Sequence, residues 1–375
     1  MAIQVNSRLV LFFTDGVSLH TWDQKGMLER EVALYNALLP HLNGIAFVTH
    51  GDGRDLNYQA RVPGIRIFCN RWNLPPQWYR RSLLPALWFW SQGCCVFKSN
   101  QVKGGQLALD LARRLGKPFI ARCGYLPSNF MGLQYGEASV QALQAQALER
   151  EVFAGATQMV VTTQAMQETL VGSYGVERQR VRVVPNYVDT DLFAPQPDRR
   201  PPLDRILFVG RLDHQKNLLA FLDGLVGLTG ELWLVGEGPQ RVLVEERARQ
   251  ATLTVRFLGN QPHGLLPSIL NEATLFVLPS LWEGHPKTLL EAMACGLPVL
   301  GSDVSGIREV IQHGENGWLC PPTQEGIGAA VRHLLAQPQL RARLGRQARQ
   351  FILDRVSLAR VVEMELDLLR QLVTD

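Results

Sequence analysis

Long apolar runs are missing from the 375-residue sequence, and so are several catalytic signatures. No run approaches the roughly 18–20 apolar residues that a membrane-spanning helix needs. The early apolar run, Leu9–Phe13, is too short for the core of a secretory signal peptide. The strings GxxxxGK(S/T) and GxSxG do not occur, which excludes a P-loop nucleotide triphosphatase and an α/β-hydrolase. The lack of a membrane-spanning run and of a signal-peptide core predicts a cytoplasmic protein.

Cysteine is scarce, and its spacing excludes the common metal and redox motifs. No CxxC pair occurs and no histidine lies at metal-ligand spacing. The six cysteines are Cys69, Cys94, Cys95, Cys123, Cys295 and Cys320. Because most of them lie in apolar runs, we expect buried, reduced thiols rather than disulfides or metal ligands.

Negative charge is missing from one long stretch. The whole chain has 38 Lys and Arg against 34 Asp and Glu, and the net charge of +4 is too small to predict nucleic-acid binding. Residues 56–109, here called the basic stretch, contain no Asp or Glu. Their basic residues are Arg61, Arg66, Arg71, Arg80, Arg81, Lys98 and Lys103. This one stretch therefore holds the whole positive excess.

Short apolar runs alternate with helical patterns, which predicts parallel sheets built from βα units. The predicted strands are Arg8–Phe13, Ile45–Thr49, Ile65–Cys69, Cys95–Phe97, Phe119–Ala121, Met159–Thr162, Val181–Val184, Ile206–Val209, Leu232–Val235, Val255–Leu258, Leu275–Leu278 and Val299–Gly301. The clearest predicted helices are Met27–Leu39, Gln106–Leu115, Ala138–Phe153, Ala165–Tyr174, Leu218–Gly227, Gln240–Arg249 and Thr288–Cys295.

A polar, proline-rich segment, Asp198–Pro202, reads as a linker between two α/β halves. We expect a first doubly wound domain over residues 1–195 and a second over 203–355, each with ligands at the carboxyl ends of its strands. Residues 356–375 carry apolar side chains at helical spacing, so we expect a helix that docks back on the first domain.

The sharpest motif runs from Leu278 to Val299. An apolar strand leads into a loop with Glu283, and a helix begins near Pro286, where a proline costs no hydrogen bond. The backbone amides of the first turn have no partner within the helix, so they predict an anion site. They belong to Lys287, Thr288 and Leu289. Glu291 lies too deep in the helix to cap it and should face a polar ligand. The alternative is that Glu283 is a solvated loop residue and Glu291 a charge on the helix surface.

A second motif, Gly210-Arg211 with Lys216-Asn217, spans the turn after the first strand of the second half. Arg211 and Lys216 can grip two phosphates from one side of this turn. The alternative is that both are ordinary surface residues beside Asp213. The nearby string Val235–Pro239 looks like a dinucleotide fingerprint, but Arg241 replaces the third glycine, which argues against a dehydrogenase.

Three strings together resemble the retaining glycosyltransferases of family 4: Glu283–Val299, Gly210–Asn217 and Val184–Phe193. The similarity covers residues 149–317 well and the first half weakly. The resemblance implies a GT-B fold, in which two Rossmann-like domains face each other across a cleft. The first domain, residues 1–195, would bind the acceptor, and the second, residues 203–355, would bind the nucleotide sugar. It also implies a nucleotide-sugar donor, no metal and no other cofactor.

The resemblance further assigns roles to residues. Arg211 and Lys216 would bind the donor diphosphate and stabilise its growing charge, Glu283 would face the transferred sugar, and Glu291 would hold the ribose. The residues expected to line the donor pocket are Gly210, Gly236, His285, Lys287, Thr288, Leu289, Gly16, Gly26 and Arg122. Glu283, Arg211 and Lys216 form the expected catalytic set.

The chain also departs from the family pattern. The usual adjacent glycines are replaced by separate ones, so either Gly16 or Gly26 is the candidate to approach the donor phosphate. No His ends the strand before the middle helix; Arg122 or Tyr125 is expected to contact the donor sugar instead, with a purely structural Arg122 as the alternative. The DxD string at 189–191 lies in a junction, where helix capping or linker solvation explains it better than metal binding.

Aromatic residues of the basic stretch include Trp72, Trp78, Tyr79, Trp88, Phe89 and Trp90. Basic and aromatic residues together suit an anionic membrane surface or a lipid-linked acceptor. The alternative is that Trp88–Trp90 fill the core and the arginines are scattered. We expect an enzyme, peripheral at the inner face of a membrane, that transfers a sugar to a glycan or lipid-linked saccharide in bacterial cell-surface polysaccharide, lipopolysaccharide or glycolipid synthesis. The alternatives are an epimerase or phosphorylase on the same fold, or a non-catalytic nucleotide-sugar-binding partner. No nucleic-acid partner is expected.

Overall fold

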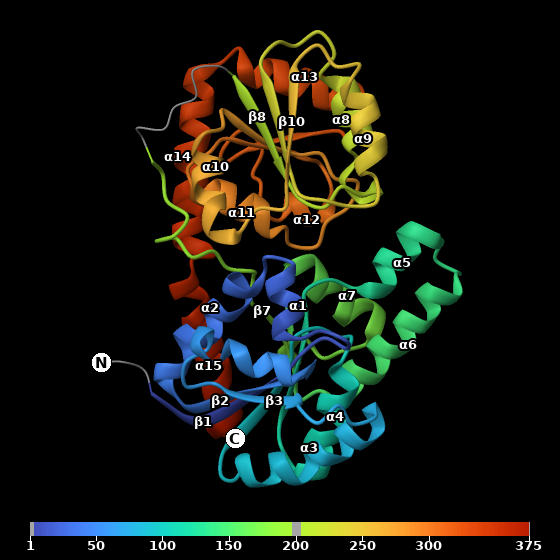
Figure 1. The fold of residues 1–375 in the computed structure, drawn as a ribbon, viewed down its shortest axis with the longest axis vertical. Coiled ribbons are helices and arrows are strands. Elements are labelled where there is room, and N and C mark those ends of the chain that lie inside the picture. The colour runs from blue at the N-terminus through green and yellow to red at the C-terminus, as the bar shows by residue number, and fades with distance from the viewer. Residues whose placement is uncertain (1–3, 197–203, 375) are drawn as a thin grey trace. The chain divides into compact units, whose positions relative to one another are not determined.

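The computed structural model describes residues 4–196 and 204–374 (Figure 1). Contacts divide the chain into a first unit, Met1–Pro185 with Val361–Asp375, and a second unit, Asn186–Arg360. The predicted linker Asp198–Pro202 lies outside the described residues. Within the described ranges, no helix has both the length and the apolar character needed to cross a bilayer.

The first unit is built on a seven-stranded parallel sheet in the order β3-β2-β1-β4-β5-β6-β7. Its strands are β1 (Val5–Phe12), β2 (Leu42–Asp52), β3 (Arg66–Asn70), β4 (Cys95–Ser99), β5 (Phe119–Cys123), β6 (Gln158–Val161) and β7 (Val181–Val183). They overlap the strands that the sequence predicts. The strand order changes direction between β1 and β4, which makes the carboxyl ends of these two strands the expected ligand position.

Helices cover both faces of this sheet (Figure 1). They are α1 (Leu19–Gln24), α2 (Leu28–Leu38), α3 (Pro76–Trp90), α4 (Gly105–Leu115), α5 (Pro127–Tyr135), α6 (Val140–Gly155), α7 (Gln164–Tyr174) and α15 (Leu358–Thr374), with 3-10 turns η1 (Leu39–His41), η2 (Gly53–Arg61) and η3 (Arg178–Arg180). Strand side chains alternate between the faces. Val10 and Phe12 of β1 accordingly share one buried cluster with side chains of α3, α4, α6 and α7.

A buried ion pair joins this sheet to the C-terminal helix. Lys98 of β4 and Glu365 of α15 are 1% and 2% exposed in their side chains, and Nζ and Oε1 lie 2.5 Å apart. Burial lowers the pKa of Lys98, and the charge and hydrogen bond of Glu365 oppose that shift. Counting Lys98 among the cations of a basic surface is therefore wrong, because its charge is buried against α15.

Helix α3 is not among the predicted helices, and it runs through Pro85. A proline inside a helix costs about 3 kcal/mol, because it removes a hydrogen bond and crowds the preceding turn. Tyr79, Leu83 and Leu87 are buried at four-residue spacing along α3. Their burial stabilises the helix by roughly 1.5–3 kcal/mol each, which offsets the cost of the proline.

The second unit repeats the architecture with a six-stranded parallel sheet in the order β10-β9-β8-β11-β12-β13. Its strands are β8 (Arg205–Val209), β9 (Glu231–Val235), β10 (Thr254–Gly259), β11 (Leu275–Leu278), β12 (Val299–Ser302) and β13 (Trp318–Cys320), the last of which the sequence did not predict. Its helices are α8 (Leu218–Gly224), α9 (Arg241–Ala248), α10 (Leu266–Asn271), α11 (Lys287–Ala294), α12 (Ser305–Arg308), α13 (Gln324–Leu335) and α14 (Pro338–Arg355), with 3-10 turns η4 (His214–Lys216) and η5 (His263–Leu265). The strand order changes direction between β8 and β11.

Residues 186–193 pack within the second unit, whereas the prediction placed the domain boundary at residue 195. Val188 forms a parallel bridge with Ser357, and Phe193 is fully buried in the core of this unit. Asp189 Oδ1 accepts the backbone N–H groups of Asp191 and Leu192, each at 3.1 Å. The first carboxylate of the DxD string thus closes a turn.

Five of the six cysteines are buried, and Cys94 is exposed. Burial raises the pKa of Cys69 to about 11 and of Cys95, Cys295 and Cys320 to about 12. These thiols therefore stay protonated and unreactive at neutral pH, since the thiolate is the reactive form.

Candidate functional site

The two motifs of the second half follow neighbouring strands of its sheet. The Gly210–Asn217 turn comes directly after β8, and the loop with Glu283 comes directly after β11. These two strands pair with each other at the point where the strand order changes direction. The structure therefore places both motifs where a doubly wound sheet binds its ligand.

The predicted catalytic residues Lys216 and Glu283 form an ion pair between these two loops. Their side chains are only 13% and 7% exposed. Glu283 Oε1 also accepts the hydroxyl of Ser280 at 2.7 Å, and Gln215 Nε2 donates to the carbonyl oxygen of Trp282 at 2.7 Å. Neighbouring hydrogen bonds thus hold the pair in place, and the pair is shielded from water. Two charges interact more strongly in such a shielded place than at the protein surface.

Arg211 points to solvent at the edge of the same turn. Its side chain is 73% exposed, and its guanidinium lies 3.0 Å from Asp213 Oδ2. A Cβ added to Gly210 would lie 2.9 Å from Phe208 Cζ and 3.6 Å from Lys216 Cε. The glycine therefore leaves room for the ring of Phe208, and Arg211 adds an exposed cation beside Lys216.

Gly236 brings the loops after β8 and β9 close together. Its φ is +125°, and an added Cβ would lie 2.0 Å from the carbonyl oxygen of Gly210. No side chain fits at that distance, so a glycine is required here. The predicted donor residue Gly236 consequently supports the backbone of the Arg211 turn.

Helix α11 begins at the same edge of the sheet. Pro286 is its N-cap, and no side chain caps the helix. The N–H of Leu290 bonds to the carbonyl of Pro286 at 3.3 Å, and the N–H groups of Thr288 and Leu289 precede that bond. Such first-turn amides, together with the helix dipole, attract an anion. Lys287, the first residue of α11, adds a positive charge at this end.

His285 fixes the start of the second unit against this loop. Its side chain is 9% exposed, and its Nδ1 accepts the backbone N–H of Asn186 at 3.3 Å. The side-chain amide of Asn186 donates to the carbonyl of His285 at 2.7 Å. A neutral His285 therefore carries its proton on Nε2.

Glu291 forms a separate buried pair. It is 2% exposed, and its Oε1 lies 3.0 Å from Nε2 of His263, which is 5% exposed. The alternative that Glu291 is a charge on the helix surface is therefore wrong. His263 had no signal in the sequence, because a single histidine in a loop belongs to no motif. The ribose contact predicted for Glu291 stays a prediction.

The first unit holds the remaining predicted residues. Gly16 lies in the loop after β1, and Gly26, with φ of +63°, closes the end of α1. Arg122 of β5 donates from its guanidinium to the carbonyl of Asn100 at 3.2 Å, and its N–H donates to Ser99 Oγ at 3.3 Å. Arg122 thus ties the ends of β4 and β5 together. Its contact with a donor sugar stays a prediction.

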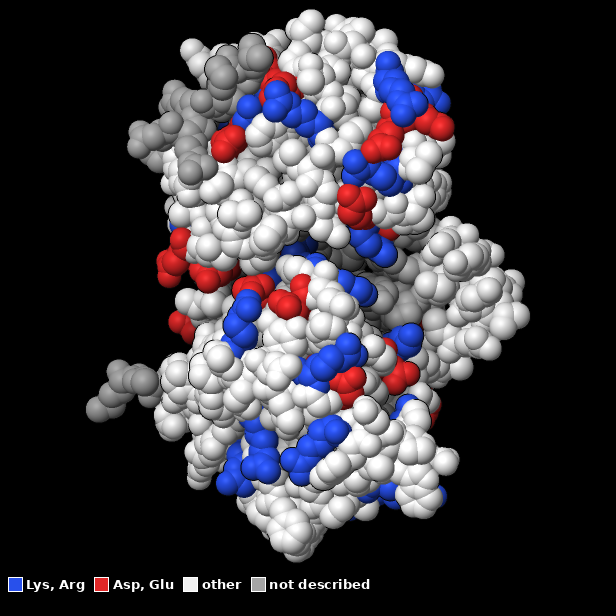
Figure 2. Space-filling view, in the orientation of Figure 1, with Lys and Arg blue, Asp and Glu red and all other residues white. Residues whose placement is uncertain are grey.

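The outer side of α3 is both basic and aromatic. Figure 2 shows Lys and Arg side chains gathered at the end of the first unit where α3 lies. The exposed fractions are 64% for Trp72, 52% for Trp78 and Trp88, and 72% for Phe89. The alternative that Trp88–Trp90 fill the core is therefore wrong for Trp88 and Phe89, whereas Trp90 is partly buried and packs against the core cluster of the first unit.

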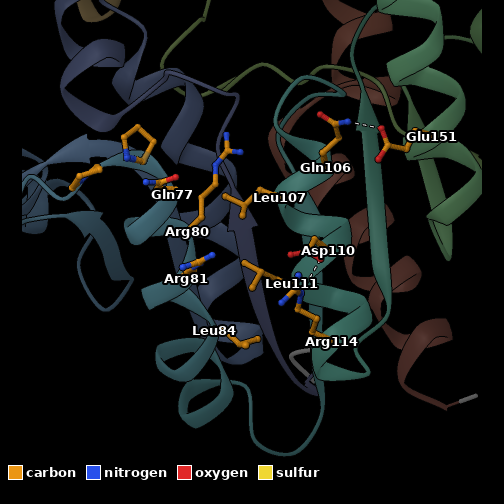
Figure 3. A pocket seen from close by; sticks show the side chains of 12 residues that line it. Gln77, Arg80, Arg81, Leu84, Gln106, Leu107, Asp110, Leu111, Arg114 and Glu151 are labelled. Carbon is orange, nitrogen blue, oxygen red and sulfur yellow. Dashed lines mark hydrogen bonds and ion pairs between the residues drawn. The ribbon is translucent and has the colours of Figure 1, made fainter.

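A groove of about 1100 Å³ runs between α3 and α4 (Figure 3). Arg80 and Arg81 of α3 and Arg114 of α4 project along it, and Arg114 is paired with Asp110 at 2.8 Å. Arg81 lies over the ring of Trp78, with 5.0 Å from Cζ to the centroid. A cation stacked in this way presents its charge and its aromatic partner on one surface.

Metal-ligating side chains do not gather in the part of the chain that the structure describes. No group of three or more His, Cys, Asp or Glu that could hold a metal ion occurs there. At the edge of the second sheet, the polar groups that lie close together are Arg211, Lys216, Glu283 and the first-turn amides of α11. These groups suit a ligand that carries phosphate and hydroxyl groups.

Two family models match the chain. The model for glycosyl transferases group 1 matches residues 191–351, and the glycosyl transferase 4-like domain matches residues 44–187. Together they cover both units, with the group 1 match over the two motifs described above.

Curated proteins and solved structures are similar to the chain. It is 30% identical over 217 residues to glycogen synthase of Mycobacterium tuberculosis (strain H37Rv), covering 55% of this chain and 52% of that protein. The chain thus spans about half the length of this relative. It is 31% identical over 276 residues to D-inositol 3-phosphate glycosyltransferase of Frankia alni, covering 66% of this chain and 67% of that protein. The crystal structure of Anabaena HepE with UDP and glucose matches with a TM-score of 0.77 at 15% identity, over 97% of this chain and 99% of that one.

Proposed function

Because the chain belongs to the family 4 glycosyltransferases, which have the GT-B fold, we propose that it is a retaining, metal-independent enzyme. It transfers a sugar from a nucleoside-diphosphate sugar to a saccharide or a lipid-linked saccharide, as in the synthesis of a bacterial cell-surface polysaccharide, lipopolysaccharide or glycolipid. The observation that carries the proposal is the meeting of Lys216 and Glu283 at the ends of β8 and β11.

The cations of the second unit account for binding and activating the donor. Breaking the bond between the sugar and the diphosphate leaves negative charge on the phosphate oxygens. Lys216, the exposed Arg211 and the first-turn amides of α11 lie at one edge of the sheet and can stabilise that charge as it grows. Glu283 holds the ammonium of Lys216 in place and lies beside the transferred sugar.

Replacement of Lys216 tests the proposal. We expect Lys216→Ala to lower kcat for sugar transfer or donor hydrolysis by about 10²–10³, because it removes one preorganised cation from the leaving group. The matched control is Lys117→Ala, since Lys117 bonds the carbonyl of Gly93 at the surface of the other unit. Undiminished turnover by the Lys216 variant would remove the phosphate assignment.

Ligand binding separates the proposal from its alternatives. Thermal shifts are measured with UDP-, GDP-, ADP- and CMP-sugars, because a ligand that binds only the native state raises its stability. A nucleotide sugar that stabilises the wild type and is consumed supports the transferase. A nucleotide sugar that stabilises the protein but is neither transferred nor hydrolysed supports a non-catalytic binding partner. A product that keeps its nucleotide and has one stereocentre of the sugar inverted supports an epimerase.

We also propose that the outer side of α3 contacts an anionic membrane surface that carries the acceptor. Exposed Trp78, Trp88 and Phe89 suit the interface between lipid headgroups and acyl chains. Arg71 and Arg81 stack on exposed tryptophans at 4.1 and 5.0 Å from Cζ to the centroid, so charge and aromatic surface coincide. Each such cation adds about 1 kcal/mol near an anionic surface.

Co-sedimentation with vesicles tests this contact. Loss of two cations is worth about 2 kcal/mol, or about thirtyfold in the partition constant, and charge reversal adds repulsion. We expect Arg71→Glu/Arg81→Glu to lose binding to phosphatidylglycerol vesicles, while Arg343→Glu/Arg346→Glu on the second unit keeps it. Equal recovery of wild type and the Arg71→Glu/Arg81→Glu variant would refute the membrane contact.

A further inference from the structure

Asn217, the residue after Lys216, has a backbone conformation that few residues accept. Its φ is +54° and its ψ is +35°, which is the left-handed helical region. Glycine and asparagine enter this region at low cost, whereas most other side chains crowd the backbone there. Among the described residues other than glycine, only Asn217 and Asn73 have a positive φ. Because η4 ends and α8 begins at Asn217, its conformation sets the direction in which the chain leaves Lys216.

The side chain of Asn217 bonds to two other loops of the second unit. Its Nδ2 donates to the carbonyl oxygen of Pro279 at 3.2 Å and to that of Pro322 at 3.0 Å. Pro279 follows β11 and opens the loop that carries Glu283, and Pro322 follows β13. An asparagine amide has two hydrogens to donate, and two different loops accept them here. Asn217 consequently ties the turn of Lys216 to the loop of Glu283.

Gln215, on the other side of Lys216, makes a second connection between the same two segments. Its side chain is buried, its backbone carbonyl accepts the N–H of Leu281 at 2.8 Å, and its Nε2 donates to the carbonyl of Trp282 at 2.7 Å. Both sequence neighbours of Lys216 are therefore bonded to the loop of Glu283. Charges held in this way need little reorganisation when a transition state forms, which makes them effective in catalysis.

Close packing of α8 against α13 keeps these bonds within reach. A Cβ added to Gly224 of α8 would lie 2.6 Å from the carbonyl oxygen of Gln324, and one added to Gly328 of α13 would lie 2.3 Å from the carbonyl oxygen of Gly224. No side chain fits at these distances, so the backbones of the two helices touch. Pro322 lies just before α13 and Asn217 just before α8, so this contact fixes the distance between them.

We propose that Asn217 is a positioning residue for the transfer reaction, whose amide holds the turn of Lys216 and the loop of Glu283 at the spacing that aligns their ion pair. The inference rests on the proposed function, because it concerns the geometry of the same site. Asn217 acts through Lys216 and does not need to touch the donor. Loss of its amide leaves both charged groups in the protein but no longer fixes one loop against the other. Because preorganised charge stabilises the transition state, kcat should fall more than donor binding.

Two variants separate the hydrogen bonds from the backbone conformation. Asn217→Gly accepts the left-handed conformation but loses both hydrogen bonds, whereas Asn217→Ala loses them and also strains the backbone. We expect Asn217→Gly to lower kcat by roughly five- to 150-fold, the value of two hydrogen bonds, with a smaller change in KM for the nucleotide sugar. Asn217→Ala should be at least as slow.

A double-mutant cycle distinguishes positioning from general support of the fold. In a Lys216→Ala protein, Asn217→Gly should lower kcat no further, because the cation that it positions is absent. General loss of stability would instead lower the activity of both backgrounds by the same factor.

Competitive labelling of the full chain with trace acetic anhydride gives a readout besides activity. Lys216 should react slowly in the wild type, because its ammonium is paired with Glu283 and its side chain is only 13% exposed. In Asn217→Gly it should react faster, while Lys117, which bonds the carbonyl of Gly93 in the first unit, keeps its rate. Mass spectrometry of the peptides measures both rates.

The matched control is Asn271→Ala. Asn271 Nδ2 also donates to two carbonyl oxygens, those of Ala194 at 3.0 Å and Pro267 at 2.8 Å, but Asn271 precedes β11 and so lies at the opposite edge of the sheet from Lys216. This variant should keep the wild-type kcat and the slow labelling of Lys216, even where its melting temperature falls.

Three outcomes would count against the inference or its premise. A wild-type kcat in Asn217→Gly would overturn it, and so would an equal fall in kcat from this substitution with and without Lys216. A wild type that turns over no nucleotide sugar would overturn the proposed function alone, because the labelling of Lys216 still shows whether Asn217 holds the ion pair.

Discussion

The buried pair of Lys98 and Glu365 offers a quantitative test of how the C-terminal helix is held. Replacing Lys98 with Met removes one charge and leaves Glu365, 2% exposed, without its partner. Glu365 Oε2 already has no hydrogen-bond partner among the described atoms. Breaking one side of a buried pair typically costs about 3–5 kcal/mol, because the remaining charge is uncompensated.

The matched control is the double variant Lys98→Met/Glu365→Met. Removing both charges also removes both desolvation penalties, and apolar replacement of a buried pair is often neutral or stabilising by about 1–4 kcal/mol. The two residues should therefore show a strong coupling free energy in a double-mutant cycle. An ordinary exposed pair would show about 1 kcal/mol or less.

Differential scanning calorimetry of the full chain measures the effect. At about 2–4 °C per kcal/mol for a unit of this size, the Lys98 variant should lower the first-unit transition by about 6–20 °C. The double variant should return close to the wild type. A Lys98→Met protein as stable as the wild type, or a double variant as unstable as the single one, would refute the description of a closely coupled buried pair.

Two further predictions concern titratable side chains. Iodoacetamide should add one label to the native protein, at exposed Cys94, and six in guanidinium chloride; more than one rapid native label, counted by mass spectrometry, would contradict the buried thiols. His50 should titrate by NMR below its ordinary pKa of 6.5, lower still in Asp15→Asn and higher in Arg80→Ala. Because folding depresses this pKa, the unfolded chain binds more protons, so the stability contributed by His50 falls as the pH drops through 6.5.

Much of the fold could be predicted, because strand and helix periods are local properties of the chain. Strand β13 escaped because Trp318–Cys320 is too short for alternation to be visible. Helix α3 was not predicted, because Pro85 interrupts the helical pattern in which Tyr79, Leu83 and Leu87 form a buried stripe. The role of Lys98 could not be predicted, since its partner is 267 residues away.

The donor-site motifs were visible because each follows a strand and opens a helix or turn. The close approach of the two motifs could not be predicted, because the order of strands in a sheet is a property of the fold. Strands β8 and β11 are neighbours in the sheet, although β9 and β10 separate them in sequence. The contacts of His20 with Asp55 and Tyr58 could not be predicted for a similar reason, because His20 is far from both in the sequence and forms no motif with them.

The second unit is an insertion within the first, and this has a consequence for biosynthesis. The chain enters the second unit at Asn186 and leaves it at Arg360. Near these two points, Val188 and Ser357 form a parallel β-bridge. On a ribosome that adds roughly 5–20 residues per second, the second unit is complete before the last helix of the first has been made. For roughly 13–50 seconds Lys98 has been synthesised and Glu365 has not. The nascent first unit must wait for its final helix, so premature termination before α15 should yield a chain that chaperones and proteases recognise as unfinished.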